Sequence, residues 1–164
     1  MIRTAIVTVS DSVAAGKRDD RSGARVRERA EALGWNVAFR EVVPDERDQI
    51  ARALIRLADS QHASLILTTG GTGVGPRDVT PEAARSVIQR EIPGLGEIMR
   101  AEGLKATPYA ALSRSLAGIR GRTLIVTLPG SPKGAQESFD AIAKLIPHII
   151  DLIEGRTEHA DVPH

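Results

Sequence analysis

Small, acidic and glycine-rich groups follow four apolar segments of the chain. Ser10-Asp11 follows the first segment, Asp45 the second, Gly70–Gly75 the third and Pro129–Pro132 the fourth. If the four segments are parallel strands, their carboxyl ends share one edge of a sheet, which is where such sheets bind ligands. The sequence therefore predicts a single site that is built from four separate parts of the chain.

The glycine-rich segment is the most distinctive of the four. Four glycines fall within six residues: Gly70, Gly71, Gly73 and Gly75. Without side chains the backbone can approach a ligand, and its N–H groups, with a following helix N-terminus, bind phosphate well. The alternative is a tight strand-to-helix turn that holds no ligand. Pro76-Arg77 stands where a Walker loop needs Lys-Ser or Lys-Thr, and a Rossmann motif would follow the first strand, so any nucleotide chemistry must use another motif.

Asp45 and Asp78 are the carboxylates that could hold a metal ion, because each stands just past the end of an apolar segment. Carboxylate oxygens suit Mg²⁺, which proteins often bind through one or two carboxylates together with substrate phosphates. The alternative is structural: Asp45 would cap a helix and Asp78 would support a turn.

Ser113-Arg114-Ser115 combines two hydroxyls and a guanidinium within an irregular part of the sequence. Such a set suits an anionic or polar ligand, although a plain surface loop is the alternative. Ser10-Asp11 has the same two interpretations, since it can bind a ligand or simply end a strand.

The elements that position these residues alternate between strands and helices. Apolar runs predict strands at residues 2–9, 36–43, 64–69 and 123–128. Helical periodicity predicts helices capped by Ser22 and by Thr80, and over residues 46–60, 95–104 and 133–154, the last kinked at Pro147. Residues 107–120 look irregular, and a disordered tail is expected from Arg156. This alternation predicts a single-domain α/β fold, a three-layer αβα sandwich with a mostly parallel central sheet.

Composition excludes several classes of protein. Aromatic residues make up 2% of the 164, too few for a base-stacking surface, and the net charge of +1 suits no polyanionic partner, so we expect no nucleic acid. The chain contains no cysteine, which excludes disulfides and thiolate metal sites. It shows no signal peptide and no membrane span, so we expect a cytoplasmic protein without a membrane partner. The four histidines show no metal-ligand spacing.

Longer motifs carry a family resemblance. Thr68–Gly73 followed by Arg77–Glu82 closely resembles the signature of the MogA/MoaB family of molybdenum cofactor biosynthesis proteins. Further matching segments are Thr8–Asp11, Asp20-x-Ser22-Gly23, Val43–Glu46, Pro93-Gly94, Leu112–Gly121 and Leu128–Pro132. The resemblance covers about residues 3–155 and implies a molybdopterin-binding domain over residues 1–155, followed by a flexible tail over 156–164.

The resemblance implies an activity and a site. Active members of this family are molybdopterin adenylyltransferases, which take Mg-ATP and molybdopterin and release pyrophosphate. Asp45 and Asp78 would then be the catalytic residues that bind Mg²⁺. With the polar segments described above, the expected substrate-binding residues are Ser10, Asp11, Thr69, Gly70, Gly71, Thr72, Gly73, Ser113, Arg114, Ser115, Pro129, Gly130, Ser131 and Pro132.

The resemblance also implies partners, and two alternatives to the adenylyltransferase stay open. Family members are usually homo-oligomers, commonly trimers, and they pass their product to a metal-insertion protein. One alternative is a non-catalytic molybdopterin-binding or scaffold protein of the same pathway. Another is a nucleotide-binding α/β protein that has no connection with molybdenum.

Overall fold

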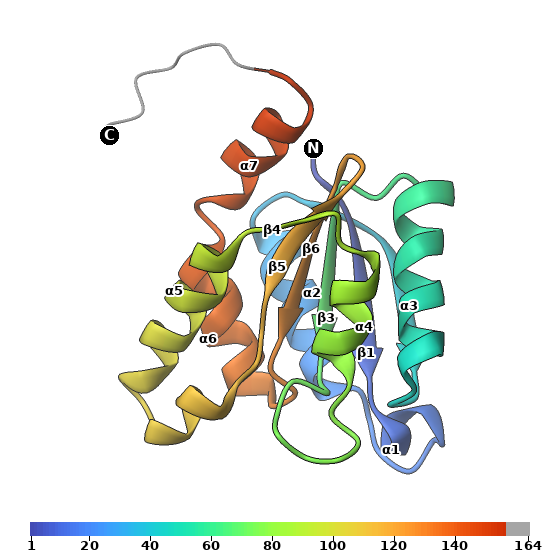
Figure 1. Cartoon of the computed structure of the whole chain (residues 1–164), viewed down its shortest axis with the longest axis vertical. Coiled ribbons are helices and arrows are strands. Elements are labelled where there is room, and N and C mark those ends of the chain that lie inside the picture. The colour runs from blue at the N-terminus through green and yellow to red at the C-terminus, as the bar shows by residue number, and fades with distance from the viewer. Residues whose placement is uncertain (157–164) are drawn as a thin grey trace.

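A central six-stranded sheet organises the protein, whose computed structural model describes residues 1–156. The strand order is β2-β1-β3-β6-β5-β4 (Figure 1). The four predicted strands are present and mutually parallel: β1 (Arg3–Val9), β2 (Asn36–Val43), β3 (Leu65–Thr69) and β6 (Thr123–Leu128). The mostly parallel sheet is therefore confirmed. Except for Arg156, the expected tail lies outside the described residues.

Two antiparallel strands complete the sheet beyond β6, where the sequence predicts only irregular chain. β5 (Ala117–Arg120) pairs with β6, and β4 (Arg90–Glu91) pairs with β5. The prediction of irregular structure over residues 107–120 was therefore wrong for its last part. β4 consists of two exposed residues, which is too short to leave an alternating pattern in the sequence.

Helices cover both faces of the sheet, as the predicted three layers require (Figure 1). On one face Val26 of α2 (Arg21–Ala32), Met99 of α5 (Pro93–Leu104) and Phe139 of α6 (Pro132–Ile142) pack against β1, β3 and β6. On the other face α3 (Arg47–Ile55) and α4 (Thr80–Val87) supply Leu54 and Val87. Alternate residues of the parallel strands enter the two cores. The remaining elements are α1 (Asp11–Ala14), a π-helical turn η1 (Arg56–Ser60), a 3₁₀ turn η2 (Pro108–Leu112) and α7 (Ile146–Ile153).

Three helix ends differ from the sequence prediction. Asp20, and not Ser22, caps α2, because its carboxylate accepts a hydrogen bond from the Gly23 N–H at 2.9 Å. Thr80 is the first residue of α4 and not its cap, and its hydroxyl donates to the carbonyl of Gly70 at 2.9 Å.

The third difference concerns the long C-terminal helix, which is two helices. It is interrupted between Ile142 and Ile146. Pro147 lies in the first turn of α7, where backbone N–H groups have no partner within the helix, so proline costs no hydrogen bond there. No helix within residues 1–156 has both the length and the apolarity to cross a bilayer.

The carboxyl ends of three strands are level with one another. Thr69 at the end of β3 pairs with Thr8 of β1 on one side and with Leu128 of β6 on the other. Gly70 then turns away with a φ of +97°, and its N–H donates to the carbonyl of Leu128 at 3.1 Å. This register places the loops that follow the strands at one edge of the sheet.

Gly70 offers a test of how closely the strand ends approach. A Cβ atom at this position would lie 2.2 Å from the backbone oxygen of Val9, so Gly70→Ala adds a clash to an unfavourable φ. We expect the substitution to lower the free energy of unfolding by about 2–4 kcal/mol, measured by urea denaturation.

Gly94→Ala is the matched control, because nothing lies within 4 Å of the added atom and the residue stands in a helix. It should change the free energy of unfolding by less than about 1 kcal/mol. Equal effects of the two substitutions would contradict the close approach at Gly70.

Candidate functional site

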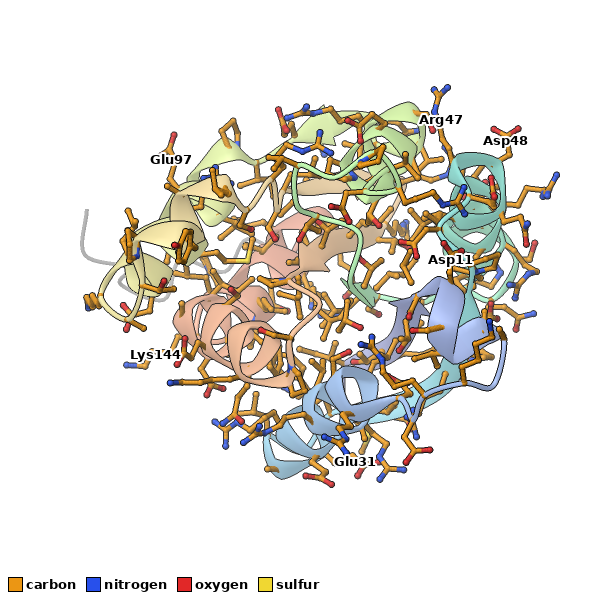
Figure 2. All side chains as sticks on the ribbon, turned by 90° about the horizontal axis from the view of Figure 1, so that it is seen from below. Asp11, Glu31, Arg47, Asp48, Glu97 and Lys144 are labelled. Atoms are coloured by element: carbon orange, nitrogen blue, oxygen red, sulfur yellow. The ribbon has the colours of Figure 1, made fainter. Side chains whose placement is uncertain are left out.

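A cavity of about 660 Å³ opens at the edge where the parallel strands end. Figure 2 views the molecule from this side. Both aspartates singled out in the sequence, Asp45 and Asp78, line it. The other lining residues come from the ends of β1 and β3, from α1, from the segment that leads into the first turn of α2, and from the start of α6: Thr8, Val9, Ser10, Val13, Arg18, Asp19, Asp20, Arg21, Ser22, Thr69, Gly70, Gly71, Gly130, Ser131 and Pro132.

Asp45 is held by a reciprocal pair of hydrogen bonds with Asp11. The Asp11 N–H donates to Asp45 Oδ2 at 2.9 Å, and the Asp45 N–H donates to Asp11 Oδ1 at 3.0 Å. The N-cap of α3 is Glu46, so Asp45 does not cap the helix as the structural alternative supposed. Burial raises the pKa of Asp45 above its usual value, and the nearby carboxylates of Asp11 and Asp78 add to this. A cation bound between Asp45 and Asp78 would relieve that repulsion.

Asp78 occupies space that two glycines leave free. The Gly75 N–H donates to Asp78 Oδ2 at 2.9 Å. A Cβ atom on either Gly73 or Gly75 would lie 2.9 Å from the same oxygen. These two glycines thus make room for a carboxylate of the protein itself, whereas the sequence suggested that they make room for a ligand. Asp78 supports the turn, as the structural alternative held, and it also lines the cavity.

Asp11 does not line the cavity, although the sequence suggested a substrate-binding role. Its carboxylate accepts two hydrogen bonds from the Arg77 guanidinium, both of 3.1 Å, and Arg77 also bonds to Glu46. The Arg77 guanidinium lowers the pKa of Asp11 below its usual value. Asp11 therefore fixes the backbone that carries Asp45.

Arg114 is also turned toward the protein and not toward the cavity. Its Nε donates to the carbonyl of Gly73 at 2.8 Å and its Nη2 to the carbonyl of Asp78 at 2.7 Å, while Nη1 pairs with Glu82. The three contacts join the two ends of the loop that carries Asp78. The sequence suggested that this guanidinium binds an anionic or polar ligand, whereas its partners in the structure are two backbone carbonyls and the carboxylate of Glu82.

A second cavity of about 320 Å³ adjoins the first and shares Gly130 and Ser131 with it. Its wall is more apolar and includes Met99, Tyr109 and Leu112. The predicted substrate-binding residues therefore divide. The first cavity is lined by Ser10, Thr69, Gly70, Gly71 and Pro132. The second is lined by Thr72, Gly73, Ser113 and Pro129. Neither is lined by Asp11, Arg114 or Ser115. Ser115 is buried and accepts a hydrogen bond from the Ser113 hydroxyl at 3.1 Å.

We did not predict from the sequence that residues around the start of α2 line the cavity. The Thr8 hydroxyl donates to Asp20 Oδ2 at 2.7 Å, and the hydroxyls of Ser22 and Thr69 lie 3.0 Å apart. A side chain at Gly23 would collide with Asp20, since a Cβ there would lie 2.3 Å from Oδ2. The Asp20-x-Ser22-Gly23 motif could have indicated this part of the site. Nothing in the sequence indicated a role for Arg18, because a charged residue in a polar loop is usually solvated.

The charges around the larger cavity suit a divalent cation with an anionic ligand. The ionisable side chains that line it are Arg18, Asp19, Asp20, Arg21, Asp45 and Asp78. Four carboxylates against two guanidiniums leave a formal charge of −2. Within residues 1–156 no three His, Cys, Asp or Glu side chains group as a complete metal site. A cation at Asp45 and Asp78 would therefore take further ligands from a substrate or from water, as Mg²⁺ commonly does.

Comparison with known proteins identifies the family. The model of a probable molybdopterin binding domain matches residues 5–148. The chain belongs to this molybdopterin-binding family. It is 44% identical over 156 residues to the molybdopterin adenylyltransferase of Helicobacter pylori strain J99, an alignment that covers 94% of this chain and 89% of the relative. Its identity to the Escherichia coli molybdopterin adenylyltransferase is 36% over 169 residues, covering 94% and 86% of the two chains.

A solved structure of the same family matches the fold. The molybdopterin biosynthesis enzyme MoaB from Thermus thermophilus superimposes with a TM-score of 0.90 at 51% identity, covering 94% of this chain and 98% of the other. The resemblance to the MogA/MoaB family read from the motifs is confirmed.

Arg114 can be tested as the anchor of the Asp78 loop in this molybdopterin-binding domain. The Arg114 guanidinium lowers the pKa of Glu82, so Arg114→Gln should return that pKa toward its usual value, as NMR titration of the carboxyl carbon can measure. Because the folded pKa is depressed, the ion pair stabilises the fold above the usual pKa of Glu, and this contribution disappears as the pH falls through the folded pKa. Loss of the hydrogen bonds to two backbone carbonyls should cost about 1–3 kcal/mol at neutral pH.

Arg85→Gln serves as a graded control, because Arg85 is the smallest contributor to the same pKa shift. It should raise the pKa of Glu82 by less than Arg114→Gln does. A Glu82 pKa that does not change in Arg114→Gln would contradict the anchoring role.

Proposed function

We propose that this protein transfers the adenylyl group of ATP to the phosphate of molybdopterin and releases pyrophosphate. The observation that carries the proposal is the presence of Asp45 and Asp78 on the wall of one cavity, beside the Gly70-Gly71 turn. Relatives named molybdopterin adenylyltransferase, which align with most of this chain, support it. The protein acts in molybdenum cofactor biosynthesis.

The reaction brings two anions together, which determines what the site must do. A phosphate oxygen of molybdopterin has to approach the α-phosphorus of ATP in line with the leaving group, against mutual repulsion. Asp45 and Asp78 would hold Mg²⁺, which when bound supplies positive charge next to the phosphates. The residues themselves fit this task, because both line one cavity and the charge of Asp78 helps to raise the pKa of Asp45, a repulsion that a cation would relieve.

The two adjoining cavities suggest how the substrates are arranged. The larger cavity carries the carboxylates and guanidiniums and suits the polyphosphate of ATP. The smaller one, with Tyr109, Leu112 and Ser113, offers the apolar surface and hydroxyl that a pterin ring needs. Gly130 and Ser131 belong to both cavities and mark the point where the reacting phosphates would meet.

The family resemblance extends the proposal beyond the single chain. We propose a cytoplasmic homo-oligomer, a trimer, that delivers adenylylated molybdopterin to a metal-insertion protein. The resemblance alone supports these three statements, and the oligomeric state is accessible to light scattering.

Removal of either aspartate's charge tests the function. We expect Asp78→Asn and Asp45→Asn each to slow pyrophosphate release from Mg-ATP and molybdopterin by at least about 100-fold, because charge neutralisation is lost in the transition state. Molybdopterin binding, measured by fluorescence, should change little.

Asp48→Asn is the matched control: Asp48 is exposed on α3 and lies at the outer edge in Figure 2, and this variant should keep the full rate. Full turnover in Asp78→Asn, or binding of molybdopterin without any ATP consumption by the unaltered protein, would favour the non-catalytic carrier.

Removal of divalent cations tests the charge balance of the larger cavity. Its wall has a formal charge of −2, so metal-free ATP should be repelled. Excess EDTA should weaken ATP binding at least about tenfold in calorimetry, since opposing charges are then uncompensated. Adenosine, which has no phosphate, should bind equally well with and without EDTA. ATP affinity that does not depend on the cation would count against the magnesium site.

A further inference from the structure

Arg18 and Arg21 are the basic side chains on the wall of the larger cavity. Arg18 lies in the segment between α1 and α2, Arg21 is the first residue of α2, and both are exposed. Among the ion pairs formed within residues 1–156, none involves either residue. Their charges are therefore available to a ligand in the cavity.

The other arginines near this edge differ in this respect. Arg77 is bound to Asp11 and Glu46, and Arg114 is bound to Glu82 and to backbone carbonyls. Arg40 approaches Asp20 at 3.4 Å. Since these guanidiniums are occupied within the protein, a phosphate in the cavity would find its free cationic partners at Arg18 and Arg21.

The first turn of α2 adds a favourable field at the same place. This helix has 12 residues, and its N-terminus directly follows Arg18 and Asp19. Aligned peptide dipoles make a helix N-terminus attractive to anions. The Asp20 carboxylate accepts hydrogen bonds from the Gly23 N–H and the Thr8 hydroxyl, and its ion-pair partner is Arg40 and neither of the two cavity arginines.

The relative positions of the two cavities determine which phosphates this segment would meet. In Figure 2 the yellow α5–η2 region, which walls the smaller cavity, lies on the opposite side of the strand ends from the blue segment between α1 and α2. The cavities meet at Gly130 and Ser131. A nucleophile that enters from the smaller cavity therefore forces the leaving group toward the blue segment, because attack and departure must be collinear.

We propose that Arg18 and Arg21 form a pyrophosphate subsite that binds the β- and γ-phosphates of ATP and then the departing pyrophosphate. This inference rests on the proposed adenylyl transfer. A phosphate oxygen of molybdopterin forms a bond to the α-phosphorus, and the bond from the α-phosphorus to the bridging oxygen of the β-phosphate breaks. The electron pair of the broken bond stays on pyrophosphate, whose added charge the two guanidiniums stabilise. The attacking oxygen is already anionic, so no proton has to be removed.

The test compares ligands that differ in their phosphates. Arg18→Gln and Arg21→Gln should each weaken the binding of magnesium pyrophosphate about fivefold to tenfold in calorimetry, as expected for the loss of a charge-assisted hydrogen bond. ATP binding should weaken by a similar factor. AMP, which lacks the β- and γ-phosphates, should bind within about twofold of the unaltered protein, because the phosphate that it retains lies elsewhere in the cavity.

Lys17→Gln is the matched control. It removes the same charge from the same segment, but Lys17 does not line the cavity. It should leave the affinities for pyrophosphate, ATP and AMP unchanged. Circular dichroism of each variant checks that the fold is kept.

Three results with the variants would overturn the subsite. They are an unchanged pyrophosphate affinity in both arginine variants, an equal loss for AMP and pyrophosphate, and an equal loss in Lys17→Gln. Absence of any pyrophosphate binding to the unaltered protein would also refute it. These outcomes are separate from failure of the proposed function, which would appear as no pyrophosphate release by the unaltered protein when Mg-ATP and molybdopterin are supplied.

Discussion

The common register of β1, β3 and β6 is the constraint on which the site depends. Thr8, Thr69 and Leu128 lie side by side, so the chain must leave three neighbouring strands at the same level of the sheet. Gly70 makes this possible, since any side chain there would meet the Val9 carbonyl. A shift of one residue in this pairing would exchange the two faces of a strand and separate the groups that form the cavity.

The loop after β3 shows how glycines can serve a site indirectly. A glycine-rich turn beside a helix suggests backbone amides that point at phosphate. Here the N–H of Gly70 binds Leu128 and that of Gly75 binds Asp78, so part of this amide set is used inside the protein. The absent side chains at Gly73 and Gly75 accommodate the Asp78 carboxylate. Electrostatic preorganisation is thus achieved by leaving space around an acidic group and by fixing its loop through Arg114.

The sequence predicted the features that depend on long patterns or on chain order. Apolar runs located the four parallel strands. Because polar segments follow the carboxyl ends of these strands, the sequence also predicted that Asp45, Asp78 and the glycine loop lie at one site. It did not reveal β4 and β5, because a two-residue strand leaves no pattern and Gly118 is required by its contact with Ile88, which is distant in the sequence. The sequence also could not distinguish an arginine that binds a ligand from one that binds carbonyls. Arg114 and Arg18 have the same chemistry, and only their surroundings separate an internal anchor from a residue of the cavity wall.

Asp45 and Asp78 share a cavity, and burial raises the pKa of Asp45, so its ionised form makes the folded state less favourable at neutral pH. A raised carboxyl pKa means that the native protein holds its proton to higher pH than the unfolded chain, and this contribution to stability declines as pH rises through that interval. The charge of Asp45, which the proposed reaction uses, is thus one that the fold itself disfavours. A neutral replacement of Asp45 should therefore be favoured in a selection for thermostability alone, and such a selection would drift toward stable, inactive proteins.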